Sequence, residues 1–209
     1  MSLFDNVLYS GILFMGISFI SGSVPYGLLY GFARGIDIRK LGSGNIGATN
    51  INRQVGFWQG FVPILILDAM KGSIPIVLFR ICVSRELDAS LFDIMEIFIG
   101  LFAMAGHIFS PFLGFKGGKG VATALGVVFA WNYMVALAII GVFSLVFFTF
   151  GKKIVGRASI STAILFPFVT YLIPNTTKPL QIAALIICII IVLTHKKNIK
   201  EWYTGQDLV

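Results

Sequence analysis

Two segments of the chain combine several glycines with basic and neutral polar side chains, a composition suited to binding phosphate. Glycine-rich backbone lets N–H groups converge on an anion without obstruction, and the N-terminus of a following helix adds a favourable dipole. The first segment, GIDIRKLGSGNIGATNINR, carries Arg39, Lys40, Arg53, Ser43, Asn45, Thr49 and Asn50. The second, GHIFSPFLGFKGGKGVAT, carries Lys116 and Lys119 on either side of Gly117 and Gly118. Both segments are therefore candidate phosphate-binding loops.

Neither segment has the pattern of a nucleotide site. The second lacks the G-x-x-x-x-G-K-[ST] spacing of a P-loop, and no strand is expected before it. We therefore expect no use of ATP. Separately, we expect no nucleic-acid partner, no metal and no cofactor.

Other polar residues occur where apolar segments dominate. Asp68 and Lys71 are spaced i, i+3 within an apolar segment, where isolated charges are costly, and this predicts a structural ion pair, with a role in a site as the alternative. His107 precedes Pro111 at the end of another apolar segment. Considered alone, it is expected to be a structural hydrogen-bonding residue, with catalysis as the alternative.

The C-terminal segment HKKNIKEWYTGQD places His195 and Asn198 among several lysines. This basic cluster can be a site, or no more than a positively charged end to the last membrane segment. In the second case, Trp202 and Tyr203 are expected to anchor the chain at the membrane interface.

These residues must be positioned by membrane-spanning helices. The chain has 209 residues, of which 57% are hydrophobic and 12% charged, with a mean hydropathy of +0.91. Open sheets would expose unpaired backbone groups to lipid, and the alternating pattern of barrel strands is absent. The composition therefore predicts an all-α, polytopic membrane protein with a single domain over residues 1–209.

Seven apolar stretches predict about seven transmembrane helices, since a crossing needs roughly 20 residues. They cover about residues 6–33, 56–80, 94–112, 120–131, 134–151, 158–173 and 180–195. Residues 120–151 are too long for one ordinary crossing, and Asn132 is a plausible reversal point. A single long tilted helix is the alternative.

The basic residues predict the orientation, because cytoplasmic loops are rich in lysine and arginine. With seven crossings, Lys71 lies within a helix and Arg80, Arg85 and Lys178 fall on one side. The other side receives Arg34, Arg39, Lys40, Arg53, Lys116, Lys119, Lys152, Lys153, Arg157, Lys196, Lys197 and Lys200. This asymmetry places the N-terminus outside and the C-terminus in the cytoplasm. For Lys152 and Lys153, orienting the chain is the favoured interpretation.

The sequence resembles the bacterial acyl-phosphate:glycerol-3-phosphate acyltransferases, the PlsY family, over essentially its whole length. Three blocks carry the resemblance: GSVPYG with DIRKLGSGNIGATN, then GHIFSPFLGFKGGKGVAT, then HKKNI with TGQD. The motif LDAMKG and the order of the blocks agree with it. The resemblance implies transfer of an acyl group from acyl phosphate to the 1-hydroxyl of glycerol 3-phosphate, giving lysophosphatidic acid and phosphate. It implies a multi-pass enzyme of the bacterial inner membrane, in contact with lipids, with a cytoplasmic active site.

The resemblance also assigns roles by matching motif positions. It implies that glycerol 3-phosphate is bound by Ser43, Arg53, a lysine of the second segment, His195 and Asn198. It implies that acyl phosphate is bound by Gly117, Gly118 and Gly120. The candidate catalytic residues are Ser43, His107, His195 and Asn198, and the further candidates for substrate binding are Arg39, Asn45, Lys116, Lys119 and Asp207.

Two positions depart from the usual family pattern. Glu201 stands where arginine is common, and Asp207, where glutamate is common, keeps the charge with a shorter reach. Neither His107 nor His195 is followed by aspartate at the His-x-x-x-x-Asp spacing of other glycerolipid acyltransferases. Because acyl phosphate is already activated, positioning and oxyanion stabilisation can suffice. The resemblance suggests that a substrate phosphate removes the hydroxyl proton.

Two other classes of protein remain as alternatives. Glycine-broken helices with basic ends also build transport sites for anionic solutes, although the sequence shows no internal repeat. A purely structural membrane subunit would not need so many polar residues in its loops.

Overall fold

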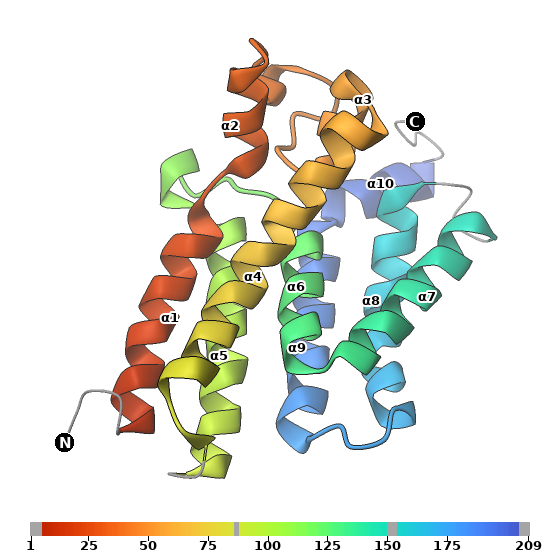
Figure 1. Ribbon diagram of the computed structural model, residues 1–209. Helices are drawn as coiled ribbons and strands as arrows, with labels where there is room; N and C mark the ends of the chain where they lie inside the picture. The colour runs from red at the N-terminus through yellow and green to blue at the C-terminus, as the bar shows by residue number, and fades with distance from the viewer. Residues whose placement is uncertain (1–5, 86–87, 150–153, 205–209) are drawn as a thin grey trace. The chain divides into compact units, whose positions relative to one another are not determined.

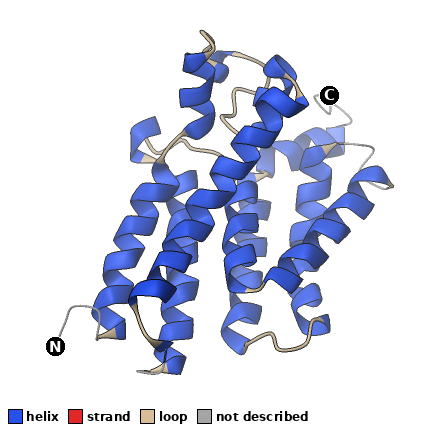
Figure 2. Cartoon of the chain, viewed as in Figure 1, coloured by secondary structure: helices blue, strands red, loops and turns tan. Residues whose placement is uncertain are grey.

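A computed structural model describes residues 6–85, 88–149 and 154–204, and every regular element in these ranges is helical (Figure 2). The chain forms two compact units, residues 1–130 and 131–209. Three residues with predictions from the sequence, Asp207, Lys152 and Lys153, lie outside the described residues.

Unit 1 contains the two glycine-rich segments and the helices that hold them (Figure 1). Its α-helices are α1 (Val7–Ser23), α2 (Tyr26–Ala33), α3 (Ala48–Val55), α4 (Val62–Cys82), α5 (Ala89–Ile108) and α6 (Val121–Trp131), which ends at the boundary between the units. Shorter elements are the 3₁₀ helices η2 (Ile38–Lys40) and η5 (Pro111–Leu113) and the π-helix η3 (Phe57–Phe61).

Helices α1, α4 and α5 lie side by side in unit 1, and α4 also packs on α6 (Figure 1). Glycines allow these helices to approach closely. A Cβ on Gly22 of α1 would overlap the Ala103 carbonyl of α5, and one on Gly126 of α6 would overlap the Ala69 carbonyl of α4. Such contacts between small residues are typical of helices that pack within a membrane.

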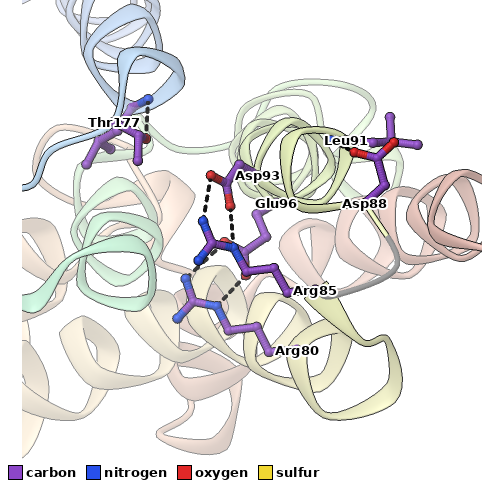
Figure 3. Close-up of polar contacts among 8 residues, drawn as sticks. Arg80, Arg85, Asp88, Leu91, Asp93, Glu96 and Thr177 are labelled. Carbon is purple, nitrogen blue, oxygen red and sulfur yellow. Dashed lines mark hydrogen bonds and ion pairs between the residues drawn. The ribbon is translucent and has the colours of Figure 1, made fainter.

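Arginine–carboxylate pairs join α4 and the segment after it to α5, at the end of α5 remote from the second glycine-rich segment (Figure 3). Arg80 donates through Nε and Nη2 to Glu96, and Arg85 donates through Nη2 to Asp93 at 3.0 Å. Arg80 also donates to the Ala130 carbonyl at 2.6 Å, which ties the end of α6 to the same cluster. The Asp93 carboxylate raises the pKa of Arg85 above its ordinary value.

Unit 2 consists of α7 (Tyr133–Phe148), α8 (Val155–Leu172), α9 (Lys178–Thr194) and α10 (Lys196–Thr204). Helix α8 packs against both α7 and α9. A bend of 60° at His195 separates α9 from α10, and α10 contacts α8 and α9. The polar C-terminal segment thus returns to the helices of its own unit.

All seven predicted apolar stretches contain helix, and the division at Asn132 is confirmed. The Asn132 side chain accepts a hydrogen bond from the Val135 amide at 3.1 Å and caps the start of α7. One continuous helix over residues 120–151 is therefore wrong. The predicted stretch 6–33 is one candidate span but not one continuous helix, because Val24 precedes a proline and adopts an extended conformation between α1 and α2.

Length and composition support fewer crossings than the seven predicted. Among the described residues, four helical segments are long and apolar enough to span a membrane, and α9 with α10 would make a fifth. They are Val7–Ala33, Phe57–Cys82, Ala89–Leu113 and Val155–Leu172. Helix α6 has 11 residues, which span about 17 Å against roughly 30 Å of hydrocarbon. Seven crossings, their orientation and the single domain stay predictions.

Candidate active site

The first glycine-rich segment is folded around the side chain of Asn50, which is buried in α3. Its Oδ1 accepts a hydrogen bond from the Ser43 amide at 3.1 Å. Its Nδ2 lies within hydrogen-bond distance of the carbonyls of Ile38, Leu41 and Asn45, at 3.2, 2.9 and 2.9 Å. One amide group thus fixes both sides of the turn that presents Ser43. The sequence identified Asn50 only as a neutral polar residue of the loop.

Backbone conformation explains the glycines of this turn. Gly42 and Gly44 have φ angles of +55° and +71°, in the left-handed region that favours glycine. The Asn45 side chain accepts from the Gly47 amide at 2.9 Å, so Asn45 also holds the loop. Its predicted contact with substrate stays a prediction.

The cations of this segment differ in their surroundings. Arg39 forms a bidentate pair with Asp37, with Nε–Oδ1 and Nη2–Oδ2 distances of 2.9 Å. The hydrogen bond from Arg39 lowers the pKa of the Asp37 carboxyl, and the same bond raises the pKa of Arg39. Arg53 is exposed near the end of α3, on the helix that carries Asn50. Substrate binding by Arg39 would therefore have to compete with Asp37.

The second segment turns back onto the end of α5. The Gly117 amide donates to the Ile108 carbonyl at 2.9 Å, and the Gly118 amide donates to the His107 carbonyl at 3.1 Å. A Cβ on Gly117 would overlap that His107 carbonyl, and one on Gly118 would overlap Nε2 of the His107 ring. These glycines are thus required by close contact with α5, and their amides already have acceptors.

The candidate anion-binding part of this loop is therefore its last turn, at the start of α6. Gly120 has a φ of +83°, and α6 begins at the next residue. The first N–H groups of an α-helix have no acceptor within the helix, and the helix dipole favours an anion there. Lys116 is exposed and Lys119 half-buried beside this turn.

The two loops lie at the same end of unit 1. Leu113 of η5 packs against the cluster that includes Ile38, Ile46 and Ile51 of the first segment. The Ser110 hydroxyl donates to the Ser23 carbonyl at 2.6 Å, which links the second loop to the break between α1 and α2. The structure therefore brings together the candidates from the first two blocks: Arg39, Ser43, Asn45, Arg53, His107, Lys116, Gly117, Gly118, Lys119 and Gly120.

The predicted ion pair between Asp68 and Lys71 is confirmed beside this loop. Lys71 Nζ lies 2.9 Å from Asp68 Oδ1, and both side chains are buried. His107, also buried, has its Nδ1 3.8 Å from the same carboxylate oxygen, beyond hydrogen-bond distance. Within the described residues, this Nδ1 makes no hydrogen bond. The ring is therefore held mainly by packing between Asp68 and Gly118.

In unit 2, His195 forms the end of α9. Its Nδ1 lies 2.8 Å from the Ile191 carbonyl, and because a carbonyl can only accept, this nitrogen carries a hydrogen. In the neutral ring, Nε2 is then an acceptor, which suits a hydroxyl group. A deprotonated phosphate oxygen at Nε2 would instead require the protonated ring.

Asn198 lies on α10 against the start of α8. A Cβ on Gly156 would be 3.0 Å from Asn198 Nδ2, and Nδ2 donates to Glu201 at 3.4 Å. Glu201, which departs from the usual family pattern, is also 3.9 Å from the Lys197 ammonium group. Its carboxylate therefore orients Asn198 and shares charge with a neighbouring lysine.

Comparisons with known proteins identify the family. The chain matches the family described as glycerol-3-phosphate acyltransferase over residues 12–205. The chain belongs to the glycerol-3-phosphate acyltransferase family. A relative from Geotalea daltonii is 40% identical over 199 residues, covering 95% of this chain and 96% of that protein. One from Prochlorococcus marinus subsp. pastoris is 37% identical over 199 residues, covering 94% and 96%.

Solved structures agree with this family membership. The chain is similar to the integral membrane glycerol 3-phosphate acyltransferase PlsY in its glycerol 3-phosphate form, with a TM-score of 0.82 and 34% identity. It is also similar to the lysophosphatidic acid form, with a TM-score of 0.81 and 33% identity. Both matches cover 95% of this chain and 94% of the solved one. The chain is therefore an integral membrane protein of the PlsY type, as its motifs predicted.

Proposed function

We propose that this protein transfers a fatty acyl group from acyl phosphate to the 1-hydroxyl of glycerol 3-phosphate. The hydroxyl oxygen bonds to the acyl carbonyl carbon, the bond from that carbon to the phosphate oxygen breaks, and inorganic phosphate leaves. The hydroxyl proton is taken up by a phosphate group. The observation that carries the proposal is the pair of basic, glycine-rich loops joined at one end of unit 1. Relatives solved in glycerol 3-phosphate and lysophosphatidic acid forms support it.

The two loops suit the two anionic substrates. The N–H groups at the start of α6, with Lys116 nearby, form a site for the phosphate of acyl phosphate. The motifs assign the binding of glycerol 3-phosphate to Ser43, Arg53 and Lys119, and also to His195 and Asn198. Asp207 stays a candidate ligand on the strength of the motif alone.

Acyl phosphate is a mixed anhydride, so the leaving group is already good. The protein then has to hold the hydroxyl near the carbonyl and stabilise the developing oxyanion. A phosphate monoester has a second pKa of about 6, so its dianion can accept the hydroxyl proton near neutral pH. No protein side chain needs to act as an indispensable general base.

The proposal includes a location for the reaction, the cytoplasmic surface of the inner membrane. Both loops lie on the side that the charge pattern predicts to carry most of the basic residues, and basic loops face the cytoplasm of a bacterial inner membrane. Both water-soluble glycerol 3-phosphate and a lipid-soluble acyl chain reach a site at that surface.

The proposal is tested with the purified full-length protein in lipid nanodiscs, supplied with a long-chain acyl phosphate and glycerol 3-phosphate. We expect one lysophosphatidic acid for each phosphate released, with no reaction when acyl-CoA replaces acyl phosphate. Lysophosphatidic acid formed only from acyl-CoA would show that acyl phosphate is not the acyl donor. Phosphate release without lysophosphatidic acid would make the protein a hydrolase, and no turnover of either kind would reject the acyltransferase.

A further inference from the structure

The buried charged residues of α4, Asp68 and Lys71, contact other segments of unit 1 as well as each other. Lys71 and Asp68 are 2% and 3% exposed, and besides pairing with Asp68, Lys71 Nζ donates to the Val24 carbonyl at 3.0 Å. Val24 lies in the break between α1 and α2, and the Lys71 ammonium group is 5.6 Å from the centre of the Tyr26 ring that begins α2. The lysine thus holds the backbone where the first helix is interrupted.

Asp68 extends the contact toward the second loop. Its Oδ1 lies between the Lys71 ammonium group and Nδ1 of His107, at 2.9 and 3.8 Å. The opposite edge of the His107 ring contacts Gly118, and the His107 carbonyl accepts from the Gly118 amide. A continuous series of contacts therefore runs from Val24 through Lys71, Asp68 and His107 to Gly118.

Helix α4 also contacts the far end of the same loop. Gly72, next to Lys71, would place a Cβ 2.5 Å from the Thr123 carbonyl in the first turn of α6. The loop is therefore attached to α4 at both of its ends, through His107 of α5 and through the start of α6. A shift of the Asp68–Lys71 pair would therefore move His107 and the start of α6, which hold the two ends of the loop, relative to each other.

Stability alone does not account for this pair. Burying two charges carries a desolvation cost that their attraction only partly offsets, and apolar residues of similar size often serve stability as well. Ionisable residues inside membrane helices are therefore functional candidates. We infer that Asp68 and Lys71 are positioning residues for acyl transfer, holding His107 and the Gly117–Gly118 backbone so that the start of α6 faces acyl phosphate. This inference rests on the proposed function of the loop.

The chain offers a matched control at the other end of the same two helices. There, Arg80 of α4 pairs with Glu96 of α5, and Glu96 is 7% exposed (Figure 3). They lie 9 and 11 residues from Lys71 and His107, which is roughly 14 and 17 Å along a helix. A structural role is open to both pairs, but only the first adjoins the loop.

The test compares three full-length variants with the wild type: Lys71→Met, the double variant Asp68→Asn/Lys71→Met, and Glu96→Gln. The double variant leaves no unpaired buried charge, so it keeps the test informative if Lys71→Met fails to fold. We expect the double variant to raise the KM for acyl phosphate at least tenfold and the KM for glycerol 3-phosphate less than threefold. Glu96→Gln should lower the melting temperature and leave both KM values within twofold.

A second measurement does not depend on turnover. Hydrogen–deuterium exchange of the peptide covering residues 108–120 should become at least tenfold faster in the double variant and stay unchanged in Glu96→Gln. If the wild type shows this exchange protection but transfers no acyl group, the proposed function is rejected. The exchange rates alone then test whether Asp68 and Lys71 position the loop. Unchanged exchange in the double variant, or an equal rise in both KM values, would overturn the inference.

Discussion

Gly118 shows how the structure can give a different reason for a glycine that a motif singles out. Its motif predicts a glycine whose bare backbone admits a phosphate. In the structure, the Gly118 amide donates to α5, and the missing side chain makes room for the ring of His107. A sequence motif records which residue a position requires, but it does not tell whether a ligand or a neighbouring helix imposes the requirement.

Gly118→Ala should therefore reduce acyl transfer by moving His107 and the loop. Overpacking a tight contact costs about 1 to 3 kcal/mol, so we expect about a tenfold or greater loss of kcat/KM for acyl phosphate. Gly16→Ala is the matched control, because a Cβ there meets nothing within 4 Å. Steady-state assays should leave Gly16→Ala within twofold of wild type. Equal activity of both variants would show that the contact with His107 is unimportant.

The polar side chains assigned to glycerol 3-phosphate give a second prediction. Arg53→Ala, Lys119→Ala and Asn198→Ala each remove a polar or charge-assisted contact worth roughly 1.5 to 3 kcal/mol. Each should raise the KM for glycerol 3-phosphate about ten- to a hundredfold or abolish transfer. Lys178→Ala changes an exposed lysine at the start of α9 and should be nearly neutral. A similar loss in all four variants would indicate a general defect in folding.

The missing general base gives a third prediction, concerning His107→Ala and His195→Ala. If a substrate phosphate accepts the proton, the acidic limb of the turnover profile should persist near the phosphate pKa of about 6 in both variants. His195 is the sharper test, since its Nδ1 contact with Ile191 makes the neutral ring's Nε2 an acceptor. Profiles are measured at saturating substrates with chemistry rate-limiting. Loss of the acidic limb with substrate binding intact would make the histidine the base.

At the scale of elements, apolar runs located the helices well, while backbone details fixed their ends. Hydrophobicity alone predicted helix in all seven stretches, and the capping side chain of Asn132 marked a true boundary. The interruption at Val24 depended on the following proline, which a hydropathy pattern does not register. The role of Asn50 in joining three carbonyls depends on tertiary contacts that no periodicity encodes.

Helix packing in unit 1 gives a prediction at this scale. Gly126→Leu would force a side chain into the Ala69 carbonyl of α4, and it should lower the free energy of unfolding by about 1 to 3 kcal/mol. Gly141→Leu in α7 is the control, since a Cβ there meets nothing within 4 Å. Thermal unfolding in nanodiscs should show a lower midpoint for Gly126→Leu only. Matching midpoints for the two variants would mean that α4 and α6 tolerate a wider separation.

At the scale of the whole molecule, the net charge of the chain is opposite in sign to the charge of its proposed substrates. The chain has a formal net charge of +7, and the candidate binding loops hold many of its cations. A positive surface raises the local concentration of anionic substrates and speeds their arrival. In the predicted orientation, the same lysines and arginines also retain their loops in the cytoplasm during insertion. Substrate binding and the predicted orientation therefore both favour positive charge on these loops.

This coupling gives the last prediction: the N-terminus lies outside, and all three motif blocks lie in the cytoplasm. A cysteine replacing exposed Ser84, between α4 and α5, should react with a membrane-impermeant maleimide in intact cells. A cysteine replacing Gly44 in the first loop should react only after the membrane is permeabilised, because that loop carries the basic residues that favour the inside. Both variants are made in a chain with Cys82 and Cys188 replaced by serine, so that neither native thiol contributes signal. Labelling of the Gly44 position from outside would reverse the orientation and move the proposed site to the opposite face of the membrane.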